Sequence, residues 1–137
     1  MSEQAATTGC EYTFTEQGIH QFIFRQSTKE AIDDFFRKLE QLFSSTAGSP
    51  INRYIVDITQ AGDRDVSLVS NVQRFRRLET LFPQRPRGRT VIIHRPGLAY
   101  NFIDSFIRAL APSRDVTRFF SVDKRDEAID WLLNENR

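Results

Sequence analysis

The sequence predicts an α/β domain with a mostly parallel sheet of about five strands and about four helices. Short runs rich in β-branched and aromatic residues alternate with longer segments in which apolar residues recur at helical spacing. The first two β-rich runs follow each other directly across a short turn, so we expect an antiparallel strand at the start of the sheet.

Length and composition indicate one domain. With 137 residues, the chain has the size of a single domain, and we expect a flexible leader over residues 1–10 and the domain over residues 11–137. The net charge of +1 does not favour nucleic acid or an anionic membrane as a partner. The single cysteine, Cys10, excludes a disulfide framework and favours a reducing compartment. Because the sequence also has no membrane-length apolar run, we expect a soluble, cytoplasmic protein.

The first half of the chain reads as a hairpin followed by a helix. Residues 11–15 and 19–25 are β-rich and flank a polar turn that contains Gly18. Ser27 and Glu30 have the spacing of a capping box, which predicts the start of a helix. Its apolar face is formed by Ile32, Phe35, Phe36, Leu39, Leu42 and Phe43. Its solvent face is predicted to carry Asp33, Asp34, Arg37, Lys38 and Glu40.

The middle of the chain continues the alternation. Gly48 and Pro50 end the helix, and the apolar run 54–58 predicts a buried parallel strand. Apolar residues at helical spacing then predict a helix over residues 66–82. After two prolines, residues 89–94 predict the next buried strand.

The last third of the chain adds two helices and one strand. Residues 98–110 have the clearest amphipathic pattern, and Pro112 ends that helix. Residues 116–122 predict the last strand, and Asp123 is placed to cap a final helix. That helix carries Ala128, Ile129, Leu132 and Leu133 on its apolar side.

In this order of elements, residues 11–135 resemble the STAS superfamily of anti-sigma factor antagonist type, and more closely its SpoIIAA-like branch, which is related to Sec14-type lipid-binding folds. The resemblance rests on the hairpin and on residues 54–59, 90–94, 116–122 and 126–132. It implies a STAS-like fold and a non-catalytic regulatory module that acts through protein–protein interaction.

The resemblance also marks a candidate phosphorylation site. Members that act as phosphoswitches carry an acidic residue followed by a phosphorylatable Ser or Thr after the third strand. Here Val66 follows Asp65, and the hydroxyl comes one residue later, at Ser67, with Ser70 nearby. The alternative is that both serines are ordinary residues of a helix start.

Polar residues follow the predicted parallel strands, where α/β sheets bind ligands. They are Asp57, Thr59, Asp63, Asp65, His94, Arg95, Ser121 and Asp123. The spacing of the aspartates does not match a calcium loop, so turn and cap roles are the simpler interpretation, and we expect no metal or other cofactor. His20 and His94 with Ser67 would be needed for a small hydrolase, but the sequence has no nucleophile elbow.

Arginines cluster over residues 74–95 even though the net charge is small. They are Arg74, Arg76, Arg77, Arg85, Arg87, Arg89 and Arg95. Their planar, permanently charged side chains suit carboxylates and phosphates, so Arg74, Arg76 and Arg77 are candidates for docking a protein partner. The alternative is a solvated helix face and loop. No exposed aromatic motif beside them favours nucleic acid.

Three functions remain open. The preferred one is a protein-binding regulatory module whose partner contacts residues 57–77. The second is a lipid- or small-ligand-binding domain with an apolar pocket under residues 98–110. The third is an enzyme, a small hydrolase, that uses His94 with the loop from Asp57 to Asp65. The 12 phenylalanines mainly predict core packing, but the adjacent pairs Phe35–Phe36 and Phe119–Phe120 suggest that one member of a pair lines a pocket or a homodimer interface.

Overall fold

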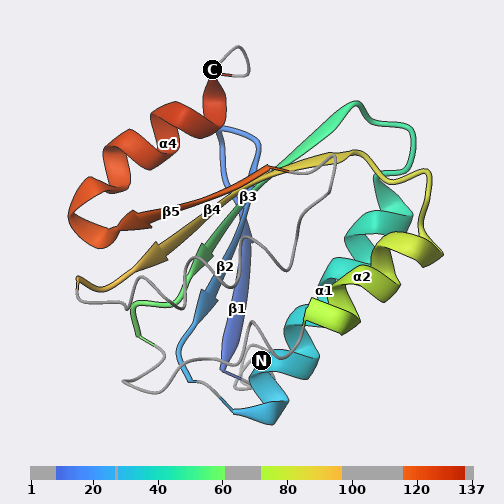
Figure 1. Ribbon diagram of the computed structural model, residues 1–137, viewed down its shortest axis with the longest axis horizontal. Coiled ribbons are helices and arrows are strands. Elements are labelled where there is room, and N and C mark those ends of the chain that lie inside the picture. Colours follow the sequence, from blue (N-terminus) through green and yellow to red (C-terminus); the bar gives the residue numbers. More distant parts are fainter. Residues whose placement is uncertain (1–8, 27, 61–71, 97–115, 135–137) are drawn as a thin grey trace.

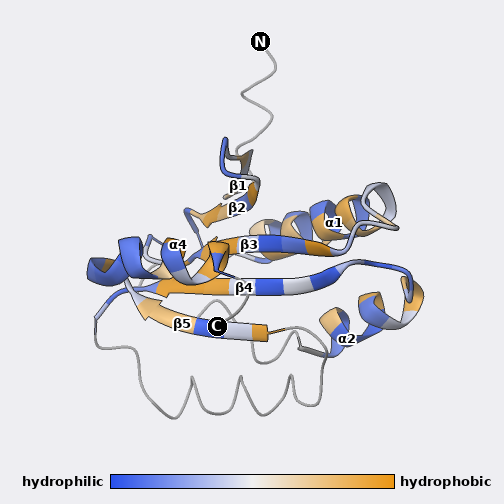
Figure 2. Ribbon diagram, turned by 90° about the horizontal axis from the view of Figure 1, so that it is seen from above, coloured by the Kyte–Doolittle hydropathy of each residue, from blue (hydrophilic) through white to orange (hydrophobic). Residues whose placement is uncertain are grey.

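The computed structural model describes residues 9–26, 28–60, 72–96 and 116–134 (Figure 1). These residues form one five-stranded sheet in which the strands lie side by side in sequence order (Figure 2). The strands are β1 (Cys10–Phe14), β2 (Ile19–Phe24), β3 (Ile51–Asp57), β4 (Arg87–His94) and β5 (Val116–Ser121). Only the β1–β2 pair is antiparallel, which confirms the mostly parallel α/β sheet.

The described helices are α1 (Lys29–Ser45), α2 (Val72–Leu81) and α4 (Arg125–Leu133), with a 3₁₀ turn (Val122–Lys124) before α4. In Figure 1, α1 and α2 lie side by side, and α4 lies apart from them. The described part of the chain therefore holds three α-helices rather than about four. The fourth predicted helix, over residues 98–110, lies outside the described residues, as do residues 66–71 of the predicted second helix.

A hydrogen-bonded turn closes the β1–β2 hairpin. Gly18 has a φ of 82°, which glycine adopts without steric cost, and its N–H donates to the Thr15 carbonyl oxygen over 3.0 Å. The Thr15 hydroxyl oxygen accepts from Ile19 N at 3.1 Å. The hairpin predicted from the sequence is confirmed.

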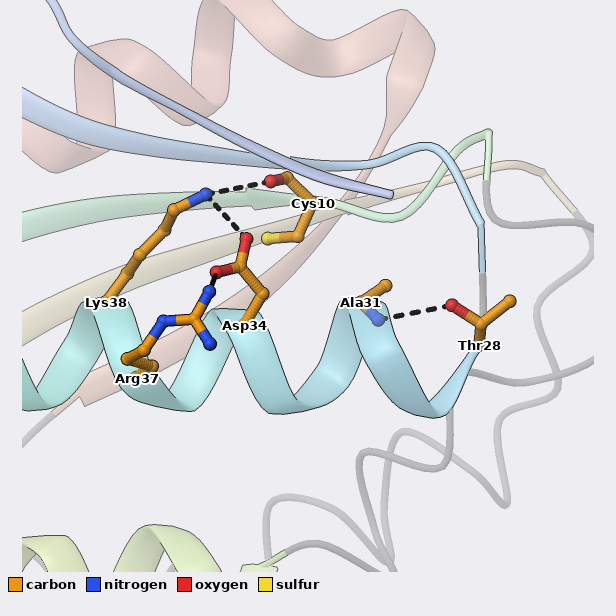
Figure 3. Close-up of polar contacts among 6 residues, drawn as sticks. All are labelled: Cys10, Thr28, Ala31, Asp34, Arg37 and Lys38. Atoms are coloured by element: carbon orange, nitrogen blue, oxygen red, sulfur yellow. Dashed lines mark hydrogen bonds and ion pairs between the residues drawn. The ribbon is translucent and has the colours of Figure 1, made fainter. Parts of the chain in front are cut away.

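Helix α1 begins one residue later than the capping pair predicted. Thr28 is the N-cap, and its Oγ1 accepts from Ala31 N at 3.1 Å (Figure 3). Ser27 lies outside the described residues. Ser and Thr are both favoured N-cap residues, so the sequence pattern alone does not separate positions 27 and 28.

The sheet packs a separate core on each face. Beneath α1 and α2 lies a cluster rich in aromatic residues, which includes Phe22, Phe24, Phe35, Phe36, Leu39, Phe43, Tyr54, Val56 and Ile92. Beneath α4 lies a smaller cluster of Ile19, Ile55, Val91, Ile93, Ala128 and Leu132. Side chains alternate between the faces of a strand, which is why neighbouring residues supply different cores.

The two pairs of adjacent phenylalanines differ in burial. Phe35 and Phe36 are each only 7% exposed and both belong to the α1 core, with ring centroids 5.3 Å apart. Phe119 packs against the α1 core, and Phe120 packs against the α4 core. Phe35 and Phe36 therefore leave no ring free, whereas Phe119 and Phe120 are each half-buried, so the expectation that one ring lines a pocket or a homodimer interface stays a prediction for this pair.

Asp34 is buried, contrary to the prediction that it faces solvent. Asp34 is 3% exposed, and its carboxylate forms ion pairs with Arg37 and with Lys38 Nζ, the latter at 2.7 Å. Lys38 Nζ also donates to the Cys10 carbonyl oxygen at 3.0 Å (Figure 3). Lys38 thus links α1 to the edge strand β1, and two cations offset the cost of burying the carboxylate.

The last helix starts without the predicted cap. Asp123 lies in the 3₁₀ turn, and Lys124 occupies the N-cap position of α4 without a side-chain hydrogen bond. Because the 3₁₀ turn comes first, α4 begins at Arg125, two residues after Asp123. No described helix is long and apolar enough to cross a membrane.

Cys10 begins β1 and is fully buried, so the sheet includes a residue that the sequence assigned to the leader. Burial raises the pKa of its thiol to about 12. We therefore predict that iodoacetamide at about pH 8 modifies Cys10 slowly in the folded protein and rapidly in guanidinium chloride, because the thiolate is the reactive form. Equal rates in the two conditions, measured by intact mass, would contradict the buried position.

Candidate functional site

The carboxyl edge of the sheet, where the parallel strands end, brings only some of the predicted residues together. Asp57 ends β3, His94 ends β4 and Ser121 ends β5. In the register, Asp57 lies beside Ile93, and His94 lies beside Ser121. The predicted residues Asp63, Asp65, Ser67 and Ser70 lie outside the described residues.

The Asp57 carboxylate holds the turn that leaves β3. Asp57 Oδ1 accepts from Thr59 N at 2.9 Å and from Thr59 Oγ1 at 2.6 Å. Asp57 is 7% exposed. One carboxylate oxygen is therefore engaged by a local turn, as the turn interpretation of the sequence expects.

Arg125 ties this turn to the last helix. Its Nη1 lies 3.3 Å from Asp57 Oδ2, and its Nη2 donates to Gln21 Oε1 at 2.5 Å. The guanidinium therefore joins β2, β3 and the start of α4. Sequence reasoning missed Arg125, although a cation in the first turn of a helix is unfavourable for the helix dipole and so hints at another role.

Arg25, which follows β2, forms a second polar group at this edge. Its Nε and Nη2 each donate to the Glu11 carboxylate at 3.0 Å, and its Nη1 donates to Gln60 Oε1 at 2.5 Å. The hydrogen bond from Arg25 holds the pKa of Glu11 below its ordinary value. These exposed residues were not singled out from the sequence, because a strand-end arginine has no pattern of its own.

His94 lies on the other face of the sheet from Asp57. Asp57 is level with Ile93, which packs in the α4 core, and the next side chain of β4 points to the opposite face. His94 Nδ1 is 2.7 Å from the Arg95 carbonyl oxygen, and its ring lies 6.2 Å from that of Phe119. The structure therefore does not bring the side chains of Asp57 and His94 together.

The other histidine, His20, is distant from the carboxyl edge. It lies level with Tyr54 and Thr90, four residues before His94 along the sheet. His20 is 7% exposed, and its Nδ1 is 2.8 Å from the Tyr12 hydroxyl oxygen. Two histidines so placed do not form one site.

Burial lowers the pKa of His20 below 6.5, although a hydrogen bond with Asn52 acts in the opposite direction. The unfolded chain then binds a proton more readily than the folded one, so stability is complete above about pH 6.5 and falls as the pH drops toward the folded-state pKa. We predict that His20→Gln flattens the dependence of the free energy of unfolding on pH between about 5 and 7. Urea titrations at several pH values measure this, and an unchanged slope would contradict it.

The arginines predicted from the sequence to form one surface lie in different environments in the structure. Arg74 donates to Asp33 Oδ1 of α1 at 2.8 Å, and its guanidinium lies 4.4 Å from the Phe36 ring centroid. Arg76 is half-buried, whereas Arg77 is exposed. Arg74, although exposed, thus fastens α2 to α1, and Arg77 is exposed on the same helix.

Two further arginines of the run are buried rather than solvated. Arg85 is 7% exposed and donates to Glu79 Oε2 at 3.0 Å. Arg89 is 6% exposed and lies against Trp131, with its guanidinium carbon 3.7 Å from the ring centroid. The solvated-face alternative is therefore wrong for these two residues. Glu79 is six positions from Arg85, whereas Trp131 is 42 positions from Arg89 and so invisible to a local pattern.

Chemically, the carboxyl edge is a set of ion pairs and hydrogen bonds that joins β2, β3 and α4. Among the described residues, no three His, Cys, Asp or Glu side chains are arranged to hold a metal ion. Comparison of the chain with protein-family models, curated proteins and solved structures gives no match.

Proposed function

We propose that the chain is a non-catalytic binding module of the regulatory, STAS-like kind, and that it recognises a protein partner through the outer face of α2. The observation that carries the proposal is the exposure of this face. Leu81 is 61% exposed, and Arg77 lies exposed one turn before it. Gln73 and Thr80, at helical spacing from Arg77, are exposed as well.

The inner face of α2 is packed, so the helix offers its outer face as a fixed surface. Leu78 is buried in the α1 core, and Phe75 is partly buried against it. Arg74 adds an ion pair and a stacking contact to α1. A rigid element presents a binding surface at little entropic cost, which favours recognition by a partner.

The charge of the outer face indicates the chemistry of the partner. Arg77 supplies a guanidinium that suits a carboxylate, and Leu81 supplies an apolar contact that can be removed from water. The partner should therefore present an apolar side chain flanked by acidic ones. The proposed contact thus shifts from Arg74, which is engaged with α1, to Arg77 and Leu81.

Charge reversal on α2 tests the proposal. The double variant Arg77→Glu, Leu81→Ser should fold normally, because both side chains are exposed, and should lose a protein that the wild type captures from extract. Quantitative mass spectrometry of the captured proteins measures this. The control is Lys124→Glu, whose side chain is 55% exposed on the 3₁₀ turn. Equal capture by the double variant would contradict the proposal that the outer face of α2 binds the partner.

Three other sequence expectations stay predictions. The apolar ligand pocket was placed under residues 98–110, which lie outside the described residues. Ser67, the predicted phosphorylation site, also lies outside the described residues. A cytoplasmic location and a homodimer are likewise predictions from composition and aromatic content.

A further inference from the structure

A second basic surface lies at the opposite end of the sheet from Asp57, on the face that α4 covers. The register places Arg53 of β3 directly beside Arg89 of β4, and Arg118 of β5 beside Val91. Arg87 precedes Arg89 by two residues and so shares its face. Figure 2 shows that β4 starts with hydrophilic positions and becomes hydrophobic toward its end.

The inner pair of these arginines holds the end of α4. Arg53 Nε donates to the Leu132 carbonyl oxygen at 3.0 Å. Arg89 donates to the carbonyl oxygens of Trp131, at 2.8 and 3.1 Å, and of Asn134, at 3.2 Å. Cations at the carboxyl end of a helix are stabilised by the free carbonyl groups there.

The buried guanidinium of Arg89 lies close enough to three neighbouring arginines to be affected by their charges. The pKa of Arg89 is lowered first by burial and then by the positive charges of Arg53, Arg118 and Arg87. Like charges placed side by side are unfavourable, so an anion nearby would be favoured. The sequence pattern includes Arg87 and Arg89 in one basic run, whereas Arg53 and Arg118 join them only through the register of the sheet.

The outer pair, Arg87 and Arg118, is exposed, and neither side chain has a carboxylate partner within the part of the chain that the structure describes. The Arg118 guanidinium lies 4.9 Å from the Phe120 ring centroid and 5.3 Å from that of Trp131. Stacking on aromatic rings fixes the direction of its donors. Val116, on the same face of β5 as Arg118, is 45% exposed.

We propose that the arginine–tryptophan surface, formed by Arg87, Val116, Arg118 and Trp131, binds an extended acidic segment of a protein. Alternate side chains of an extended peptide repeat every 6.5–7 Å or so, which is also the repeat of residues along β4 and β5. The register places Arg87, Val116 and Arg118 level with positions 87, 89 and 91 of β4. Two carboxylates four residues apart on one face of the segment can therefore reach Arg87 and Arg118, while an apolar side chain midway between them on the same face covers Val116.

A peptide fits this surface better than a single-stranded nucleic acid. Nucleic-acid binding without base readout depends on free aromatic faces on which bases stack. Arg89 already stacks on the Trp131 ring at 3.7 Å. With this face of the indole occupied, the surface offers oriented hydrogen-bond donors rather than a stacking platform.

Trp131 is the one tryptophan of the chain, so its fluorescence reports on this surface directly. The probe is the synthetic peptide acetyl-Glu-Ser-Leu-Ser-Glu-amide, whose two glutamates and leucine share one face of an extended chain. It is titrated at low ionic strength because exposed ion pairs are screened by salt. We expect a saturable change in Trp131 fluorescence and a matching heat signal. The peptide in which glutamine replaces every glutamate should give neither.

Single-residue variants locate the binding. Arg87→Gln and Arg118→Gln should each weaken peptide binding by about tenfold, which is the effect of losing one charge-assisted hydrogen bond. Arg87 has no contact with Trp131 in the structure, so its variant leaves the reporter intact. The control is Lys124→Gln, exposed on the 3₁₀ turn and outside both proposed surfaces, which should bind as the wild type does. Arg77→Gln reports separately whether the peptide binds the outer face of α2.

The outcomes separate this surface from the proposed α2 surface. Loss of peptide binding in Arg77→Gln but not in Arg87→Gln and Arg118→Gln would overturn the inference and move the peptide to α2. Absence of binding to the wild type would overturn it as well. Tighter binding of a ten-residue oligothymidylate than of the peptide, lost in the same two variants, would replace the peptide by nucleic acid.

Discussion

Replacing Arg89 with alanine should lower the free energy of unfolding by about 3 kcal/mol, because the variant loses a desolvated cation–π contact and several charge-assisted hydrogen bonds. Arg89 donates to the Trp131 and Asn134 carbonyl oxygens and stacks on the Trp131 ring while being 6% exposed. Urea denaturation followed by circular dichroism measures the loss.

Arg89→Lys is the matched variant, because lysine keeps the charge but cannot form the planar fork or stack in the same way. It should be destabilised by about half as much as the alanine variant, on the scale of one to two hydrogen bonds. If Arg89→Ala unfolded within about 0.5 kcal/mol of the wild type, the arginine would behave as an ordinary surface residue and would not anchor α4.

Asp57→Ala should destabilise the protein by about 2 kcal/mol, because it removes the acceptor for Thr59 and leaves Arg125 without its ion-pair partner. Asp57 is buried at the end of β3, whereas the Arg125 side chain is 34% exposed. The coupling between the two should therefore be smaller, about 1 kcal/mol, in a double-mutant cycle with Arg125→Ala.

Urea denaturation of the four proteins in that cycle measures whether Asp57 and Arg125 stabilise the fold together. Thr59→Val is a useful third variant, since it keeps the backbone N–H that donates to Asp57 and removes only the hydroxyl donor. Strict additivity of Asp57→Ala and Arg125→Ala would show that the arginine does not join α4 to β3.

Much of the fold follows from local patterns. The hairpin could be predicted because Gly18 and the flanking β-rich runs act within a few residues of one another. The buried strands ending at Asp57 and His94 could be predicted because apolar runs after helices are typical of parallel sheets. Asp57 itself was identified because strand ends in α/β sheets are a recurrent place for polar residues.

Contacts between distant segments could not be predicted in this way. Asp34 is buried because α1 lies against β1, where Lys38 reaches a strand carbonyl. Arg89 is buried because α4 ends over it, and that packing joins residues 42 positions apart. Arg125 reaches Asp57 across 68 positions. A periodic pattern places a side chain on a face of its own element but does not say what covers that face.

Packing between distant segments also explains why the arginines of the basic run end up in different environments. Arg77 and Arg89 lie 12 positions apart in one basic segment, yet Arg77 is exposed on α2 and Arg89 is buried beneath α4. The sheet separates α2 from α4, because the two helices pack against the two different cores. One basic run in the sequence thus supplies two surfaces and several structural contacts.

Photo-cross-linking from α2 tests the proposed function most directly. A benzophenone side chain in place of the exposed Thr80 should give one discrete adduct with another protein, and Arg77→Glu in the same chain should abolish it. The same group in place of Glu127, exposed on α4, should not give that adduct. No adduct from position 80, or the same adduct from both positions, would contradict the claim that the outer face of α2 binds a protein partner.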